Sequence, residues 1–444
     1  MIINELMVKF NLKKAIDILN NLYGENQSGV IRNRYKTLIS NLFTDDLQQG
    51  NLRVFSAPGR TELAGNHTDH NQGKVLAAAV QLDYAAIVQK RNDNVIFFRS
   101  TGFTDISVKL TDESSKLDLE PQPEETGKTE ALIRGIASEF HRRGYKVGGF
   151  TVNSSSAVLP GSGLSSSAAV EVLFGRIISS LYNEDENNKS GLNALEIAQI
   201  GQIAENKFFG KPCGLMDQIA CSFGGVVAID FKDTANPLVN QIDFNPSAFG
   251  YTLCVVNTGG SHANLTADYA SIPTEMKSIA SFFGKSVLRE LDKNTVIDQS
   301  VKLKKEFGER AFQRAIHFFE ENARVDAMVE TLSGTLKHEA FNQYLDLVNE
   351  SGNSSQHLLQ NIFSPGNPEN QSLGTALALT KDFFRDQNIR GACRVHGGGF
   401  AGTIQTYIPK DAIGAYRACM EDSFGAGCVT ELRIRSAGAF ELDL

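Results

Sequence analysis

The chain has 444 residues, of which 41% are hydrophobic and 21% are charged, and its formal net charge is −8. This length predicts roughly two or three domains, and the composition is that of an ordinary globular protein. The negative charge argues against a nucleic-acid partner, and because no apolar run approaches the length of a bilayer span, no membrane partner is expected.

Residues 1–50 are predicted to form a helical extension, because Leu12, Ala15, Ile16 and Leu19 recur at helical spacing. Charged residues interrupt the apolar ones near the start of the chain, so no signal peptide is predicted. The six cysteines show no CxxC pair and no metal-ligand spacing, which favours free thiols in a reducing compartment. The expected location is therefore the cytoplasm.

A polar loop lies between a short predicted strand at residues 53–57 and a longer apolar one at residues 75–88. Dense polar side chains in a turn-rich loop beside a strand suit hydrogen bonding to a small polyol. A metal site on this loop would need a fourth ligand that the sequence does not signal. The polar residues of the loop include Arg60, Glu62, Asn66, His67, Asp69, His70 and Asn71.

Strands at residues 95–99 and 106–110 and an amphipathic helix at 130–143 are predicted next. They lead to a strand at 149–153 and a loop of glycine and serine. A helix predicted after the loop leaves its first N–H groups without partners, and these groups with the helix dipole attract anions. The loop therefore predicts a phosphate site, although a Gly-Ser turn that caps an ordinary helix fits the pattern equally well. Its residues are Pro160, Gly161, Ser162, Gly163, Leu164, Ser165, Ser166 and Ser167.

A predicted helix at residues 194–209 carries Glu205 and continues into Pro212-Cys213-Gly214-Leu215-Met216-Asp217-Gln218. Pro212 and Gly214 break the chain, so Asp217 falls in the first turn of a new helix, where the helix dipole favours its charge. From the local sequence alone, Asp217 is explained as an acidic residue that favours the start of a helix, and Glu205 as a solvent-exposed carboxylate on a helix.

The second half of the chain begins, in this interpretation, after a strand at residues 226–231 and a polar link that ends near 250. A strand at 251–257 is followed by a polar stretch that contains Tyr269. Residues 285–390 are predicted to be mostly helical, with Arg310, Arg314, His317 and Arg324 on a solvated helix face. A glycine-rich turn, a strand at 403–407, a helix near 411–420 and a strand at 431–435 close the chain.

Four of these stretches, spread in order over residues 53–403, resemble motifs of the GHMP kinases. Residues 160–169 resemble the phosphate-binding loop of that family. Residues 391–403 resemble its C-terminal glycine motif, with departures at Val395, His396 and Ala401. Residues 212–218 resemble the corresponding run of galactokinases. Residues 59–73 resemble the galactokinase signature, with matches at Arg60, Gly65, His67, Asp69, Asn71 and Gly73.

The resemblance implies an α+β fold with two domains and an active site between them. The N-terminal domain, expected at residues 51–245, would be like domain 2 of ribosomal protein S5. The C-terminal domain, expected at residues 246–444, would be ferredoxin-like. Residues 1–50 would be an N-terminal helical extension.

The resemblance also implies an ATP-dependent sugar kinase that phosphorylates the anomeric hydroxyl of galactose. Carried over residue by residue, Asp217 is the catalytic base and Arg60 lies beside the anomeric hydroxyl. Residues 160–167 bind ATP. Glu205 with Ser166 or Ser167 holds Mg²⁺, and which serine is the ligand stays open. The sugar-binding residues implied are Asn66, His67, Asp69, Gly214 and Tyr269.

Because the sequence departs from the signature at several positions, the identity of the sugar substrate is undecided. Glu62 stands where the family has Asn, Asn66 where it has a sugar-binding Glu, and His70 where it has Tyr. The missing charge at position 66 removes a repulsion against a C6 carboxylate, so galacturonate or another modified galactose-type sugar is an alternative to galactose. A non-catalytic galactose sensor and a kinase for a non-sugar alcohol such as mevalonate are further alternatives. The choice between monomer and homodimer is open.

Overall fold

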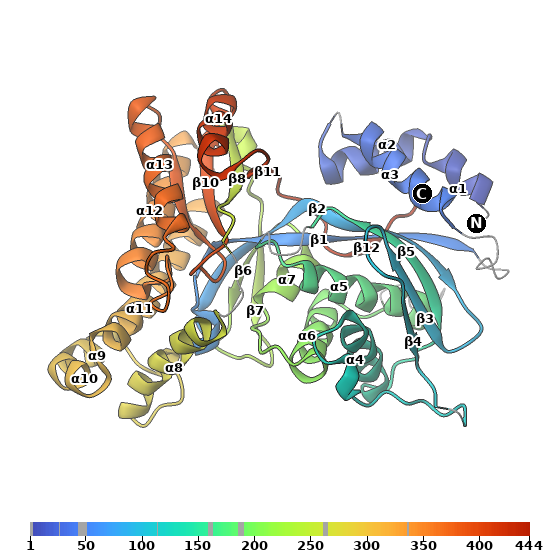
Figure 1. Cartoon of the computed structure of the whole chain (residues 1–444), viewed down its shortest axis with the longest axis horizontal. Helices are drawn as coiled ribbons and strands as arrows, with labels where there is room; N and C mark the ends of the chain where they lie inside the picture. Colours follow the sequence, from blue (N-terminus) through green and yellow to red (C-terminus); the bar gives the residue numbers. More distant parts are fainter. Residues whose placement is uncertain are drawn as a thin grey trace.

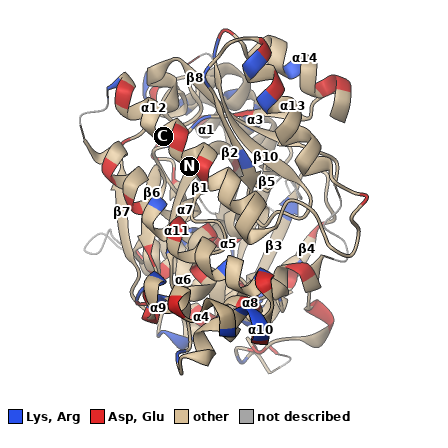
Figure 2. Cartoon of the chain, turned by 90° about the vertical axis from the view of Figure 1, so that its left-hand side faces the viewer, with Lys and Arg blue, Asp and Glu red and all other residues tan. Residues whose placement is uncertain are grey.

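The computed structural model describes residues 3–25, 27–42, 51–112, 114–158, 163–184, 191–260, 265–334 and 337–444. Two β-sheets, one of eight strands and one of four, lie side by side with helices packed on them (Figure 1). Charged residues lie mostly on the helices and loops, while the strands carry few (Figure 2). The helices of the described residues include none that is both long enough and apolar enough to cross a membrane.

The larger sheet is organised around β2, a strand of 17 residues that pairs with β1, β5 and β6. The order is β12-β1-β2-β5-β3-β4, with β6 on β2 and β7 on β6, and every pairing is antiparallel except β3 with β5. Its strands are β1 (Leu52–Ala64), β2 (Lys74–Lys90), β3 (Val95–Ser100), β4 (Ile106–Lys109), β5 (Phe150–Ser156), β6 (Val226–Asp230), β7 (Leu238–Ile242) and β12 (Phe440–Glu441).

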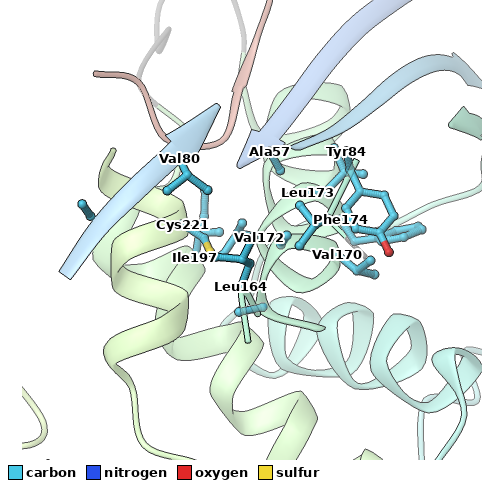
Figure 3. Packing of buried hydrophobic residues seen from close by; sticks show 14 of the residues in the cluster. Ala57, Val80, Tyr84, Leu164, Val170, Val172, Leu173, Phe174, Ile197 and Cys221 are labelled. Carbon is cyan, nitrogen blue, oxygen red and sulfur yellow. The ribbon is translucent and has the colours of Figure 1, made fainter. Parts of the chain in front are cut away.

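Helices α4 (Thr129–Arg142), α5 (Ser166–Ile178), α6 (Ala194–Ala204) and α7 (Met216–Phe223) cover one face of this sheet (Figure 1). Most residues of α5 after its first turn are buried, so the helix runs through the middle of the core. Leu164, Val172, Leu173 and Phe174 pack there with residues of the sheet and of α6 and α7 (Figure 3). The apolar packing fixes where α5 begins, and the candidate site lies at that end.

The smaller sheet has the antiparallel order β11-β8-β10-β9. Its strands are β8 (Tyr251–Asn257), β9 (Ala392–His396), β10 (Thr403–Pro409) and β11 (Val429–Leu432). The surrounding helices are α8 (Thr266–Phe282), α9 (Lys293–Asp298), α10 (Ser300–Phe307), α11 (Glu309–Ser333), α12 (His338–Ser354), α13 (Ser372–Asp386) and α14 (Ile413–Phe424). Chain segments before β12 return to the larger sheet, where Ile434 bridges to Val80. The division at residue 246 therefore stays a prediction.

Two expectations for the second half of the chain are wrong. The link before residue 250 contains β7, whose side chains are mainly exposed and do not alternate between apolar and polar as those of a half-buried strand do. The predicted solvated face of α11 is buried at Arg314 and His317, because α8, α12 and the loop after β1 pack around it.

The three N-terminal helices lie on the face of the larger sheet opposite α4–α7 (Figure 1). They are α1 (Ile3–Lys9), α2 (Lys13–Tyr23) and α3 (Ser28–Ser40), which confirms the helical character predicted for the described part of residues 1–50. Leu6, Phe10, Leu19 and Tyr35 pack on residues of β1 and β2.

A buried ionic cluster around Asp83 of β2 fastens these helices to the sheet. Asp83 is fully buried and accepts hydrogen bonds from Arg34 Nη1 at 2.6 Å, Tyr23 Oη at 2.5 Å and Arg435 Nη1 at 3.2 Å. Burial alone would raise the pKa of Asp83, but the two guanidinium groups and the hydrogen bonds hold it below its usual value. The cluster joins α2, α3, β2 and the C-terminal segment at one carboxylate.

Replacing this carboxylate by an amide should destabilise the protein. In Asp83→Asn, two buried or half-buried arginines lose their counter-charge, and we expect a loss of about 3–5 kcal/mol in the free energy of unfolding. Urea denaturation at neutral pH measures it. Because the native pKa is lowered, the contribution is lost as the pH falls through that pKa, so the difference between variant and wild type should shrink in acid. Asp443→Asn is the control, since its partner Lys14 is largely exposed. Equal effects of the two variants would contradict the assignment.

Candidate active site

The predicted site residues that the structure describes lie on β1 and the loop after it, at the starts of α5 and α7, at the end of α6 and on α8. Asn66, His67 and Tyr269 contact the turn at residues 397–399, which follows β9 of the smaller sheet. The register of β1 on β2 shifts between Pro58 and Arg60, which marks a bulge at Gly59. A bulge turns the following side chain to a new direction, and a Cβ at Gly59 would lie 2.6 Å from the Leu164 carbonyl oxygen. Glycine thus lets β1 pass close to the phosphate loop.

Arg60 and Asp217 form a two-pronged ion pair at the centre of the site. Arg60 Nε and Nη2 donate to Asp217 Oδ1 and Oδ2, each at 2.8 Å, and Arg60 Nη1 donates to the Gly163 carbonyl oxygen at 2.6 Å. The Arg60 side chain is 8% exposed and that of Asp217 is 32% exposed. Burial acts to raise the pKa of Asp217, but Arg60 and the hydrogen bonds hold it below its usual value. The carboxylate is ionised at neutral pH and one side of it is accessible.

The phosphate loop is described from Gly163 onward, and the predictions for Pro160, Gly161 and Ser162 lie outside the described residues. Gly163 has φ +73°, and a Cβ there would lie 2.8 Å from Thr403 Oγ1. The Leu164 carbonyl accepts a hydrogen bond from the Arg60 backbone at 3.0 Å. The end of the loop is therefore held between β1 and the smaller sheet.

A cavity of about 520 Å³ opens beside the start of α5. Its walls combine apolar and aromatic side chains with polar and charged ones, and they include Ser166 and Ser167 at the start of α5, where the first N–H groups of the helix lack helical partners. The residues that line the cavity include Tyr84, Phe98, Lys128, Ser166, Ser167 and Val170. No local pattern in the sequence marks the cavity, because its walls come from separate strands and helices.

Glu205 lies next to the loop, at the junction of α6 with the π-helical turn η5 (Glu205–Phe209). It is 2% exposed, and its Oε1 accepts hydrogen bonds from Ser167 Oγ at 3.2 Å and Lys211 Nζ at 2.9 Å. Hydroxyl and carboxylate oxygens are the ligands that Mg²⁺ prefers, so Ser167 and Glu205 fit this ion. Ser166 lines the cavity together with Ser167.

A metal site in the polar loop after β1 is not supported. Among the side chains that the structure describes, none form a group of three His, Cys, Asp or Glu residues suited to a metal ion. His67 and His70 instead stack their rings at a centroid distance of 6.2 Å.

His67 and Tyr269, two of the predicted sugar-binding residues, converge on the turn at residues 397–399. His67 Nε2 donates to the Gly398 carbonyl at 2.9 Å. Burial lowers the pKa of His67 to about 4, so the ring is neutral at neutral pH and its proton is on Nε2. Tyr269 Oη donates to the Gly399 carbonyl at 3.0 Å, and a Cβ at Gly398 would lie 2.5 Å from the Tyr269 ring.

Asp69 and Gly214 also lie against each other. A Cβ at Gly214 would lie 1.9 Å from Asp69 Oδ2, so only glycine permits this approach. Asp69 Oδ1 accepts from the backbone N–H of His70 at 2.9 Å. The structure thus places the loop after β1 beside the start of α7, next to Asp217.

Asn66 differs from the other predicted sugar-binding residues because it is fully buried. Its Nδ2 donates to Glu62 Oε1 at 3.0 Å and to the Gly397 carbonyl at 2.6 Å, and its Oδ1 accepts from Asn361 Nδ2 at 2.7 Å. Glu62 in turn pairs with Arg394 Nη2 at 2.6 Å, inside the protein. The side-chain amide of Asn66 therefore makes its hydrogen bonds to other groups of the protein, and its contact with a sugar stays a prediction.

Helix α11 supports this loop through residues that the sequence did not single out as functional. His317 Nε2 donates to the Asn66 carbonyl at 2.9 Å, and Glu321 Oε1 accepts from the Gly65 backbone N–H at 3.0 Å. Both side chains are fully buried. Their spacing of four residues on one helix face was available in the sequence, but polar side chains on such a face are usually solvated.

Comparison with known proteins agrees with this geometry. Residues 131–225 match the model for the GHMP kinases N terminal domain, and residues 41–90 match the galactokinase galactose-binding signature. A galactokinase of Glaesserella parasuis is 30% identical over 381 residues, which cover 83% of this chain and 88% of that protein. The chain belongs to the galactokinase family of GHMP kinases. A galactokinase of Streptomyces coelicolor is 29% identical over 398 residues, with 88% of this chain and 94% of that protein covered.

Solved structures show the same fold. The galactokinase of Lactococcus lactis complexed with galactose has a TM-score of 0.71 at 21% identity, with 96% of this chain and 99% of that chain covered. The mevalonate kinase of Methanococcus jannaschii has a TM-score of 0.59 at 14% identity, with 87% and 99% covered. These likenesses, with the two sheets and their helices, confirm the predicted α+β GHMP kinase fold.

The buried contact between Glu62 and Asn66 gives a test of stability. Asn66→Glu would place a second carboxylate within hydrogen-bonding distance of Glu62, with Arg394 as the shared partner, and should destabilise the protein by about 3 kcal/mol or more. Glu62→Asn should also destabilise it, because the buried Arg394 loses its ion-pair partner. The double variant restores one carboxylate and one amide. Its loss in the free energy of unfolding should therefore be smaller than the sum of the losses in the two single variants. Thermal and urea unfolding of the three variants measure this, and strictly additive losses would contradict the coupling.

Proposed function

We propose that this galactokinase-family chain transfers the γ-phosphate of ATP to the anomeric hydroxyl of galactose. The observation that carries the proposal is the Arg60–Asp217 pair, which is hydrogen-bonded through Arg60 to the loop that begins α5. It places a carboxylate, a guanidinium and an anion-binding helix end at one point. Phosphoryl transfer needs mainly alignment and neutralisation of charge, and these three groups supply both.

The nucleotide is assigned to the cavity beside α5. Tyr84, Phe98 and Val170 offer apolar surface for the base. The charged side chains in the wall are Lys128, Asp105 and Glu130. Backbone N–H groups at the start of α5 and the hydroxyls of Ser166 and Ser167 face the phosphates. Glu205 and Ser167 would hold Mg²⁺, which when bound neutralises phosphate charge.

Asp217 is assigned as the group that accepts the proton of the sugar hydroxyl. Its pKa is below the usual value, so it is ionised and ready to accept at neutral pH, but it is a weak base. In a loose transition state the proton is transferred late, and orientation of the hydroxyl matters more than basicity. Arg60 keeps the carboxylate ionised and lies where it can offset charge on the transferred group.

Galacturonate is the second candidate substrate, and one observation favours retaining it. Position 66 is neutral, and the nearby charge of Glu62 is matched by Arg394, so this part of the protein presents no uncompensated negative charge. The sensor alternative is disfavoured because the ion pair, Glu205 and the described part of the loop are assembled as a kinase requires. The mevalonate alternative leaves the loop of His67 and Asp69 without a role.

The test of the function is ADP release with Mg-ATP and a panel of acceptors: galactose, N-acetylgalactosamine, galacturonate, arabinose, glucose and mevalonate. We expect turnover with galactose. Turnover on mevalonate alone would overturn the assignment to sugars. Absence of turnover with every acceptor, together with a rise in melting temperature on adding galactose, would instead indicate a sensor.

Truncation of the base should abolish most of the chemistry without preventing binding. For Asp217→Ala we expect kcat to fall by about 10² to 10⁴, because the hydroxyl loses both its proton acceptor and its orienting partner. Steady-state kinetics with galactose measure the loss, and calorimetry with a non-hydrolysable ATP analogue checks that nucleotide binding persists. Asp346→Ala, which removes a carboxylate from a largely exposed ion pair on α12, is the control. Turnover of Asp217→Ala near the wild-type rate would remove Asp217 from the mechanism.

Exchange of the residues at positions 62 and 66 should change the choice of sugar. In the double variant Glu62→Asn with Asn66→Glu, a carboxylate returns to the position where the galactokinase signature has one. We expect the ratio of kcat/KM for galactose over galacturonate to rise about tenfold or more, since a like charge rejects the acidic sugar. An unchanged ratio in a folded double variant would show that position 66 does not select the sugar.

A further inference from the structure

The hydroxyl of Ser165 does not do what a serine at the start of a helix usually does. Ser165 occupies the N-cap position of α5, where a serine normally has extended backbone angles and accepts a hydrogen bond from the first turn. Here its backbone is left-handed, with φ +57° and ψ 62°, and its side chain makes no capping hydrogen bond. A left-handed conformation is uncommon for a residue other than glycine and marks a place where the surroundings impose it.

The hydroxyl is directed at the catalytic pair instead. Ser165 Oγ donates to Asp217 Oδ2. The chain on its N-terminal side is held by Arg60, which contacts the carbonyls of Gly163 and Leu164, and by the buried Leu164 side chain. On its C-terminal side α5 begins at once. The position of the Ser165 hydroxyl is thus fixed from both directions.

The two oxygens of Asp217 are therefore not equivalent. Oδ2 accepts from Arg60 Nη2 and from Ser165 Oγ, whereas Oδ1 accepts only from Arg60 Nε among the donors that the structure describes. A carboxylate oxygen has two lone pairs in its plane. Oδ2 is saturated, and Oδ1 keeps one position open on a side chain that is 32% exposed.

We propose that Ser165 is a positioning residue for the transfer, whose hydroxyl occupies Asp217 Oδ2 and leaves Oδ1 as the atom that takes the proton of the acceptor hydroxyl. This rests on the proposed function. In the step, the O–H bond of the acceptor breaks and its proton goes to Oδ1. The freed electron pair forms the bond from oxygen to the γ-phosphorus, and the bond from phosphorus to the ADP oxygen breaks with its electron pair.

One consequence concerns the phosphate loop itself. Ser165 has a single O–H, so while it donates to Asp217 it cannot donate to a phosphate oxygen. The direct phosphate contacts fall to Ser166, Ser167 and the backbone. The loop thus serves the acceptor side of the reaction through Ser165 and the nucleotide side through the two residues that follow it.

The variants Ser165→Ala and Ser165→Gly separate the hydroxyl from the backbone. Both remove the donor, but glycine adopts the left-handed conformation freely and alanine does not. If the hydroxyl matters, both should lower kcat by about tenfold or more, the effect of losing a hydrogen bond to a charged group, with KM for ATP nearly unchanged. In an Asp217→Asn background, the Ser165 substitutions should have little further effect on the residual rate, since Ser165 acts through Asp217.

The pH dependence gives a readout that a merely structural role would not move. Loss of a donor to the carboxylate raises the pKa of Asp217, so the acidic limb of the profile of kcat/KM should shift to higher pH in both variants. The other titratable side chains that face Asp217 are unchanged in these variants, so the shift reports on Ser165. These are Arg60 on β1, Glu171 on α5, Lys211 and Cys213 before α7, Cys221 on α7 and His396 on β9.

Three results would overturn the proposal. Wild-type rates in Ser165→Gly with a defect only in Ser165→Ala would assign the residue to backbone conformation. A raised KM for ATP with unchanged kcat and pH profile would make Ser165 a phosphate ligand. If the wild type phosphorylates no acceptor, the proposed function fails. The hydrogen bond from Ser165 to Asp217 can then still be tested, by measuring the pKa of Asp217 through NMR titration of ¹³C-labelled aspartate. An Asp217 pKa that is equal in wild type and Ser165→Ala would then show that the hydrogen bond does not exist.

Discussion

The ion pair between Arg60 and Asp217 determines how the parts of the site fit together. A guanidinium that is 8% exposed has lost most of its hydration, and only close, well-aligned partners offset that cost. Arg60 finds them in both oxygens of Asp217 and in the Gly163 carbonyl. The bulge in β1, the start of α7 and the end of the phosphate loop must therefore all be in place at once. An error in any of the three would leave a buried charge without a partner.

Around this pair, a second set of buried polar contacts connects the loop after β1 to the smaller sheet and its helices. Asn66 contacts Glu62, Asn361 and the turn at 397–399, and α11 contributes His317 and Glu321. Buried networks of this kind are rigid when satisfied and costly when a partner is lost. The exchange of carboxylate and amide between positions 62 and 66, relative to the galactokinase signature, keeps one negative charge in the network and places it against Arg394. The loop after β1 is then held in shape by a different arrangement of the same two residue types.

Much of the fold follows from local signals in the sequence. The apolar runs that became β2, β3 and β8, and the breaks at Pro212 and Gly214, depend on neighbouring residues alone, so the elements lie close to their predicted places. The buried face of α11 could not be predicted in this way. Arg314, His317 and Glu321 have the composition of a solvated face, and only contacts with distant segments show that they are buried. The cavity beside α5 was missed for the same reason, because its walls come together only in the folded chain.

Within the phosphate loop, the two left-handed residues illustrate what the sequence leaves undecided. Gly163 and Ser165 have similar positive φ values, of +73° and +57°. At position 163 the reason for glycine is steric, since a Cβ would press on Thr403 and His396. At position 165 glycine would relieve the strain, yet the chain has a serine there. A strained residue persists where its surroundings require it, and here the requirement is its contact with Asp217. The order of glycine and serine in this loop therefore reflects two different constraints: space for the backbone at 163 and a hydroxyl for the carboxylate at 165.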